Sequence, residues 1–184
     1  MKKITALLLI LALAFSTALS ACTNDTPDSE NDDGKAETTE VFTGTVSEIF
    51  ESITAKSGVQ DFDTFDEALT NENSDYTVGL SSDEVDTYVE DGIVSVAAMM
   101  TSAHLASLIK AKDAESAAKI AGIIAENFDP YRWVCVMPNQ CTVITAGNYV
   151  LLVASNGAIA QGYLKAFKSL AGDASGEENT FFNG

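Results

Sequence analysis

The sequence predicts an α+β fold: a four-stranded antiparallel sheet in ββαββα order, with helices packed on one face. Three observations lead to this prediction. From residue 93 onward, short β-type apolar runs alternate with longer runs whose apolar residues recur at steps of three and four. Gly147-Asn148 lies between two β-type runs, which is a hairpin signal. The 184 residues are 46% hydrophobic, which suffices for one folded core.

An N-terminal helix is predicted before the sheet, over residues 46–57. Thr45 and Glu48 have the spacing of a capping box, and Gly58 can end the helix. The residues between them are apolar at helical spacing. We therefore expect an amphipathic helix that precedes the sheet in the chain and packs on it.

Two shorter helical segments are predicted next, over residues 61–75 and 81–88. The four predicted strands are residues 93–100, 104–110, 141–146 and 149–154. Two amphipathic helices follow the two strand pairs, and they cover residues 113–128 and 157–171. Asp113 is the expected N-cap of the first, and Gly172 is the expected C-cap of the second. The tail carries Phe181-Phe182, which either docks on the core or frays.

Residues 1–21 have the composition of a secretory signal: two lysines, an apolar run of 12 residues, then small residues. Leu19-Ser20-Ala21-Cys22 resembles the lipobox of bacterial lipoproteins. The resemblance implies a diacylglyceryl group on Cys22 and a protein anchored to the extracytoplasmic face of the cell membrane. Two acyl chains suffice for stable anchoring. The alternative is an ordinary signal peptide followed by a chance cysteine.

The sequence divides into a signal peptide (1–21), a disordered acidic tether (22–40) and a single α+β domain (41–184). Residues 23–40 hold seven acids and one lysine, with no aliphatic residue larger than alanine, so they cannot bury a core. The chain has a formal net charge of −17, and loss of the two signal-peptide lysines makes it −19. This acidity argues against a nucleic-acid partner, because proteins bind nucleic-acid phosphates mainly with Lys and Arg side chains.

About half of the chain, residues 76–171, resembles a family of small bacterial lipoprotein domains, domain-of-unknown-function family 4358. The resemblance rests on residues 78–80, 83–88, 99–103, 110–113 and 147–155, above all on Gly147-Asn148-Tyr149 and the apolar strand after it. The chain departs from the family at His104, Cys135 and Cys141. The resemblance implies a lipid-anchored extracytoplasmic domain and implies no activity.

Five residues lie between Cys135 and Cys141 in the chain, among them Pro138-Asn139. Outside the cytoplasm such a pair is most simply a disulfide. Free buried thiols are the first alternative. A redox or metal role is the second, although the spacing differs from the Cys-x-x-Cys of redox sites.

No metal or cofactor is predicted. His104 is the only histidine, and nothing in the sequence places it beside Cys135 and Cys141 for a zinc site. Acids at positions 61, 63, 67 and 72 have part of the spacing of a calcium loop. The required ligand and glycine are replaced by Phe65 and Asp66, so a solvated acidic segment is the preferred interpretation.

The segment Tyr131-Arg132-Trp133 contains the only arginine and the only tryptophan. Both residue types are common in binding hot spots, so the segment is a candidate partner-binding loop. The alternative is a connection whose tryptophan closes the core. Phosphate-binding loops and nucleophile elbows are absent from the sequence.

The sequence therefore favours a non-catalytic module at the cell envelope. It is held to the membrane by lipid on Cys22, and its expected partner is an envelope protein, a peptide or a wall component. An enzyme with an unrecognised acidic site, and a structural or adhesion lipoprotein, are the alternatives.

Overall fold

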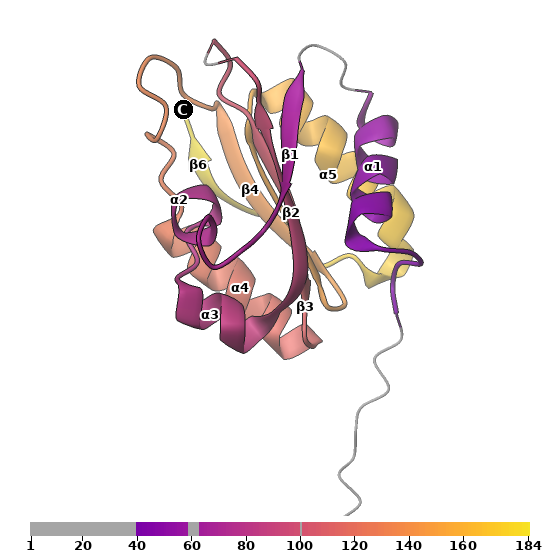
Figure 1. The fold of residues 1–184 in the computed structure, drawn as a ribbon. Helices are drawn as coiled ribbons and strands as arrows, with labels where there is room; N and C mark the ends of the chain where they lie inside the picture. Colours follow the sequence, from indigo (N-terminus) through magenta and orange to yellow (C-terminus); the bar gives the residue numbers. More distant parts are fainter. Residues whose placement is uncertain (1–39, 59–62, 100) are drawn as a thin grey trace, which may run out of the picture. The chain divides into compact units, whose positions relative to one another are not determined.

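The computed structural model describes residues 40–58, 63–99 and 101–184 (Figure 1). All three stretches belong to one compact unit, Ala36–Gly184. The predicted signal peptide, Cys22 and the tether up to residue 39 lie outside the described residues, as does Asp61. The predicted lipid attachment therefore stays a prediction.

A single antiparallel sheet runs through the domain in the order β1-β2-β3-β5-β4-β6. The strands are β1 (Thr64–Ala68), β2 (Val89–Ala97), β3 (Leu105–Ala111), β4 (Gln140–Ala146), β5 (Tyr149–Ser155) and β6 (Asn179–Asn183). The α+β class and the antiparallel sheet are confirmed. The predicted number of four strands is wrong, because the sheet has six. The four predicted strands are the central ones, and β1 and β6 add at the two edges.

The strand β1 falls where a short helix was predicted over residues 61–75, so that prediction is wrong. Thr64–Ala68 pairs with the second half of β2. All five residues of β1 are exposed, so no buried-exposed alternation marks the strand in the sequence. The helical part of this region is the short α2 (Ser74–Val78) alone.

The strand β6 is the tail that carries the two neighbouring phenylalanines. The Phe181 ring lies 6.0 Å from the ring of Phe128, and the Phe182 ring lies 5.7 Å from that of Tyr131. β6 pairs with β4 across a register shift. Of the two alternatives left open by the sequence, docking is the one that the structure adopts.

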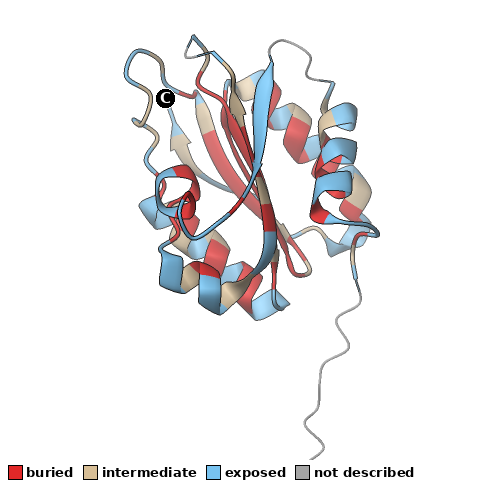
Figure 2. Cartoon of the chain, viewed as in Figure 1, coloured by how far each residue is buried: buried red, intermediate tan, exposed pale blue. Residues whose placement is uncertain are grey.

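Helices cover both faces of the sheet, not one (Figures 1 and 2). On one face lie α1 (Val46–Ser57) and α5 (Gly157–Ala171), and on the other lie α2, α3 (Ser82–Tyr88) and α4 (Ala114–Asn127). The reason is in the central strands, since every residue of β5 is buried. A strand that is apolar on both sides needs cover on both sides.

The predicted capping box of α1, the N-cap of α4 and the turn between β4 and β5 are confirmed. The Thr45 hydroxyl accepts a hydrogen bond from the Glu48 N–H at 3.3 Å, and the Glu48 carboxylate accepts one from the Thr45 N–H at 2.9 Å. The Asp113 carboxylate accepts from the Ser116 N–H at 2.7 Å and so caps α4. Gly147 has φ 57 in the turn between β4 and β5, where a residue with a side chain is strained.

The N-terminal segment before α1 is fixed to one end of the sheet. Lys110 Nζ, at the end of β3, lies 3.5 Å from a carboxylate oxygen of Glu40. Phe42 is 6% exposed, and its ring lies 4.9 Å from the ring of Tyr149, edge to face. Glu40 and Phe42 thus lie at this end of the sheet, where β3 finishes and β5 begins.

Candidate functional site

The loop after α4 places the only arginine of the chain against the end of α2. Asp129 shapes the loop, because its carboxylate accepts a hydrogen bond from the Tyr131 N–H at 2.8 Å. Arg132 Nη1 donates to the Thr77 carbonyl oxygen at 2.7 Å. This carbonyl belongs to the last turn of α2, where backbone oxygens lack helical partners. Arg132 therefore ties the loop to α2.

The helix α2 comes close to α4 because it ends at a glycine. Gly79 is its C-cap and has φ 78, in the left-handed region. A Cβ atom at this position would lie 2.9 Å from backbone atoms of Asn127 and Phe128. Glycine alone permits this approach, which sets α2 beside the loop that carries Arg132.

Two aromatic rings flank the Arg132 guanidinium. Its Cζ atom lies 5.8 Å from the ring centroid of Tyr76 and 5.5 Å from that of Trp133. Both distances are within the range of a cation–π interaction. Burial lowers the pKa of Arg132, while Tyr76 and Asp129 act in the opposite direction. The guanidinium is a cation at neutral pH in any case, since arginine keeps its proton in proteins.

An open groove of about 320 Å³ lies beside this arginine. We call it the Arg132 groove. It is lined by Glu67, Tyr76, Thr77, Val96, Ala97, Met99, Ser102, Arg132 and Trp133. Arg132 and Glu67 are the charged side chains of this lining, and most of the others are apolar or aromatic. Such a lining suits a ligand that has both apolar and polar groups.

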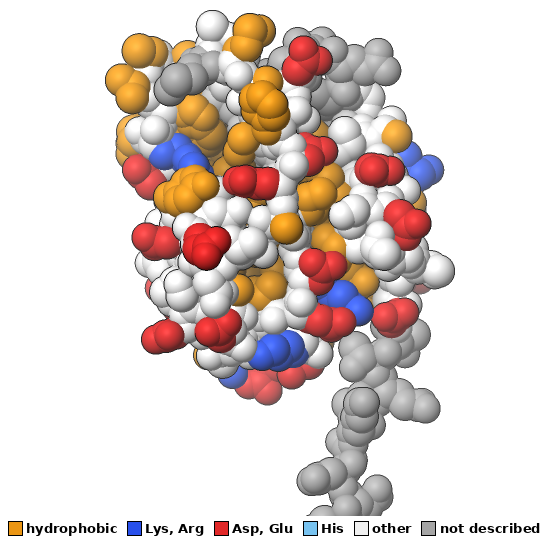
Figure 3. All heavy atoms as spheres, in the orientation of Figure 1, with side chains coloured by type: hydrophobic (Ala, Val, Ile, Leu, Met, Phe, Trp, Pro, Cys, Tyr) orange, Lys and Arg blue, Asp and Glu red, His pale blue; other side chains and the backbone are white. Residues whose placement is uncertain are grey.

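Large hydrophobic side chains are exposed around the groove. The exposed ones are Phe65, Tyr76, Met99, Tyr131, Val134 and Met137. They belong to β1, α2, the loop after β2 and the loop before β4. The start of β1, the end of β2 and the start of β4 share one end of the sheet, and Tyr76 of α2 lines the groove together with Met99. Figure 3 shows hydrophobic side chains gathered at the upper left, above α2. Exposed apolar patches of this kind mark interaction sites.

Arg132 forms no ion pair with any residue that the structure describes. The ion pairs of residues 40–58, 63–99 and 101–184 belong to Lys110, Lys119 and Lys168. The donors of Arg132 other than Nη1 likewise have no hydrogen-bond acceptor in these stretches. Among the described residues, the partners of the Arg132 guanidinium are thus a carbonyl oxygen and two aromatic rings.

The structure brings together two of the three residues of the predicted partner-binding loop. Arg132 and Trp133 line the groove, whereas Tyr131 lies outside the lining and contacts the Phe182 ring. Tyr76 and Met99 were missed by the sequence reasoning. Each is a single residue far from the loop in the chain, so no local pattern could have assigned either one to it.

The predicted pair Cys135 and Cys141 is not bridged in the structure, where both thiols are free. Cys135 is exposed in the loop before β4, whereas Cys141 is fully buried within β4. Burial raises the pKa of the Cys141 thiol to about 12, which makes it a poor nucleophile at neutral pH. The alternative of free buried thiols is therefore correct for Cys141 and incorrect for Cys135, whose thiol is exposed.

His104 lies in the core. Its Nδ1 is 3.1 Å from the Ser155 hydroxyl oxygen, and its ring centroid is 5.6 Å from that of Tyr163. Both His104 and Ser155 are 1% exposed, so a substrate has no access to the pair. Burial lowers the pKa of His104 to about 4, against a weaker opposite effect of Asp66. The arrangement is that of a neutral core histidine.

The acidic segment does not form a metal site in the described stretches. No group of three or more His, Cys, Asp or Glu side chains there could hold a metal ion. Asp63 and Glu67, two members of the calcium-like spacing, lie just before and within the extended strand β1. A calcium loop must curl its ligands around one point, which a strand prevents.

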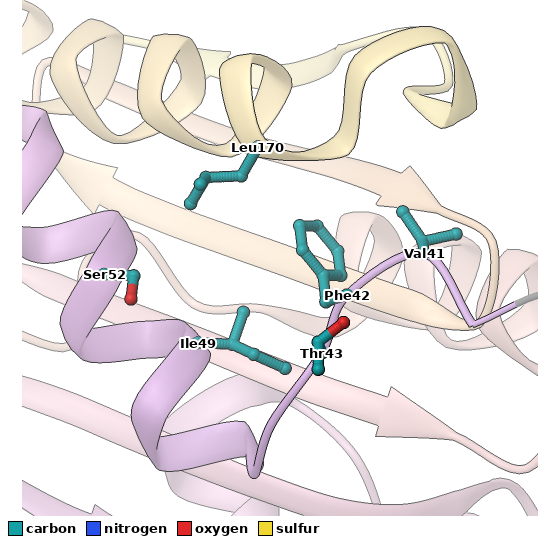
Figure 4. A pocket seen from close by; sticks show the side chains of 6 residues that line it. All are labelled: Val41, Phe42, Thr43, Ile49, Ser52 and Leu170. Carbon is teal, nitrogen blue, oxygen red and sulfur yellow. The ribbon is translucent and has the colours of Figure 1, made fainter.

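A second hollow, of about 240 Å³, lies between α1, α5 and the N-terminal segment (Figure 4). It is lined by Val41, Phe42, Thr43, Ile49, Ser52 and Leu170. The lining carries no charged side chain, and its two hydroxyl groups do not form a converging polar set. The Arg132 groove is therefore the better candidate site.

Comparison of the chain with models of known families, with curated proteins and with solved structures finds no match. The helices in the described stretches include none that is long and apolar enough to cross a membrane.

Proposed function

We propose that this protein is a non-catalytic binding module, lipid-anchored through Cys22 on the extracytoplasmic face of the cell membrane. Its ligand is a peptide segment of an envelope protein, bound in the Arg132 groove. The observation that carries the proposal is Arg132 itself. Its guanidinium lies within about 6 Å of the ring centroids of Tyr76 and Trp133 at an open groove and forms no ion pair with the described residues.

The chemistry of the groove favours a peptide. A guanidinium presents several donors in a fixed fork, which suits backbone carbonyl and carboxylate oxygens. Tyr76, Met99 and Trp133 give the walls area for an apolar side chain. Aromatic and arginine side chains with this exposure dominate the binding energy of many interfaces.

The position of the groove also supports a partner away from the lipid. Glu40 contacts Lys110 at one end of β3, and the groove is lined by residues at the opposite end of the adjacent β2. Five residue steps along a strand separate the two ends by about 17 Å. Residue 40, the first that the structure describes, thus lies at the end of the sheet opposite the groove.

Trp133 provides the test, because it is the only tryptophan and lines the groove. Titration of a panel of short peptides is expected to change its fluorescence for those that bind. Arg132→Gln is expected to weaken these peptides at least about tenfold. Lys119→Gln is the matched control, since Lys119 also lies over a ring, that of Tyr88, outside the groove lining.

If Arg132→Gln and Lys119→Gln lose affinity equally, the loss comes from the change in net charge that both variants share, and the proposal is contradicted. The lipid anchor has its own test, which is metabolic labelling with a tagged fatty acid. Label is expected on the wild-type protein and absent from Cys22→Ala. Label that persists on Cys22→Ala would disprove attachment at this residue.

A further inference from the structure

The strand β1 is an open edge of the sheet. Among the described residues it pairs with β2 alone, and in Figure 1 it is the strand at the front of the sheet. All five of its residues are exposed, and Phe65 is 67% exposed. An unprotected edge strand is a template for another strand.

The register of β1 on β2 defines which backbone groups are unpaired. The Leu69 N–H donates to the Gly92 carbonyl, and the Ala98 N–H donates to the Asp63 carbonyl. Because hydrogen-bonded pairs alternate along an antiparallel ladder, the odd-numbered residues of β1 bond to β2. The N–H and C=O groups of Thr64 and Asp66 therefore point away from the sheet.

One end of this edge is closed by the chain itself. The Asn73 side-chain amide donates to the Ala68 carbonyl at 2.9 Å. Among the described residues, no side chain bonds to the backbone of Thr64 or Asp66, and the one hydrogen bond between the two joins their side chains, at 3.3 Å. The open stretch thus runs from Thr64 to Asp66.

The charge of this edge selects the partner. β1 carries Asp66 and Glu67, Asp63 directly precedes it, and it contains no basic residue. Symmetric pairing of β1 with a second copy would bring these acids opposite one another, which is unfavourable. A strand with basic side chains would meet opposite charges instead.

The edge and the Arg132 groove are continuous. Phe65 pairs with Val96 and Glu67 pairs with Val94, so the side chains of Phe65 and Glu67 lie on the face of the sheet that carries the groove. Glu67 and Val96 both line the groove. An added strand would place every second side chain on this face, beside the groove.

We propose that an extended basic segment of a partner protein adds to β1 as an antiparallel strand. This inference rests on the proposed function and specifies its ligand. The residues opposite Glu67 and Asp66 are basic, and the residue opposite Phe65 is apolar and faces the groove. The expected pattern, from N- to C-terminus, is therefore basic-basic-apolar. Main-chain bonds to Thr64 and Asp66 supply affinity, and the side chains supply selectivity.

The probe is the blocked peptide Thr-Lys-Lys-Ile-Thr-Val, titrated into the full chain and followed by amide hydrogen exchange. The peptide is expected to slow exchange of the Thr64 and Asp66 amides. The amides of Phe65 and Glu67 already bond to β2, so their exchange is expected to change little. Protection that is absent from Thr64 and Asp66 would overturn the proposal.

Backbone methylation provides the matched control on the peptide. Methylation of the second lysine nitrogen, which faces Asp66, is expected to weaken binding at least about tenfold. Methylation of the isoleucine nitrogen, which faces away from β1, is expected to leave affinity within about twofold. Equal effects of the two methyl groups would exclude strand addition.

Protein variants separate this inference from the proposed function. Asp66→Asn is expected to weaken the lysine peptide several-fold, whereas Asp173→Asn, an exposed acid in the turn after α5, is not. If Arg132→Gln weakens the peptide and backbone methylation has no effect, the groove is retained and strand addition fails. If the peptide does not bind, the inference fails while other peptides still test the groove. Dimerisation that Asp66→Asn enhances would identify a second copy as the occupant and also overturn it.

Discussion

The buried residue His104 makes the free energy of unfolding depend on pH. It directly precedes β3, and its Nδ1 lies 3.1 Å from the hydroxyl oxygen of Ser155, the last residue of β5. Burial disfavours the imidazolium and lowers the pKa from 6.5 to about 4. The unfolded chain therefore binds a proton at a higher pH than the folded chain does.

This difference predicts acid destabilisation through His104. The free energy of unfolding is expected to fall as the pH decreases from about 6.5 to about 4, because the unfolded state takes up the proton first. The contribution of His104 is expected to be about 3 kcal/mol across this window. Urea unfolding of the wild type and of His104→Gln, at closely spaced pH values, measures it.

Contributions of other groups to the pH dependence are common to both proteins. The difference between the two pH profiles therefore isolates the histidine. A His104→Gln profile parallel to that of the wild type would show that the imidazole does not carry the effect.

The central elements of the sheet could be predicted from the sequence, whereas its two edge strands could not. β5 is buried along its whole length, and α5 has apolar residues at helical spacing, so both have strong periodic signals. β1 and β6 have none, since their position depends on partners far away in the chain. Tyr76 and Met99 could not be assigned to the candidate site from the sequence, because they reach the groove through contacts between segments that are far apart in the chain. Arg132 and Trp133 could be assigned, because they are adjacent in the chain and chemically distinctive.

The edge strands also predict unequal losses of stability from the same substitution. Phe181 of β6 is partly buried against Phe128, whereas Phe65 of β1 is 67% exposed. Phe181→Ala is expected to lower the free energy of unfolding by about 1–2 kcal/mol, below the cost for a fully buried phenylalanine. Phe65→Ala is expected to change it by less than about 0.5 kcal/mol.

Chemical unfolding of the two variants, with the wild type as reference, decides the matter. A Phe181→Ala protein as stable as the wild type would mean that β6 frays in solution. A large loss in Phe65→Ala would mean that the β1 edge is covered, which would also remove the basis for strand addition.

At the scale of the whole molecule, the acidic residues divide the domain in two. Residues 41–92 hold thirteen acids and only Lys56, and they form α1, β1, α2, α3 and the start of β2. Residues 93–184 hold seven acids and six bases, and they form most of the sheet with α4 and α5. The charge is thus concentrated on the β1 side of the fold, where the proposed basic partner binds.

This distribution predicts that salt stabilises the domain. Two like charges about 10 Å apart in water repel by about 0.4 kcal/mol, and 0.1 M salt reduces the screening length to about 10 Å. The exposed ion pairs of Lys119 and Lys168 are also screened, but such pairs contribute little. The free energy of unfolding is expected to rise by about 1 kcal/mol between low salt and physiological salt.

Calcium chloride at the same ionic strength separates screening from specific binding. The acidic residues of β1 lie in an extended strand and cannot surround one ion. Calcium and sodium salts are therefore expected to give the same unfolding curves at matched ionic strength. An additional stabilisation that saturates with calcium would reveal a cation site on the acidic half. Such a site would compete with the basic segment for Asp66 and Glu67, so binding of the lysine peptide would then fall with calcium and be restored by a chelator.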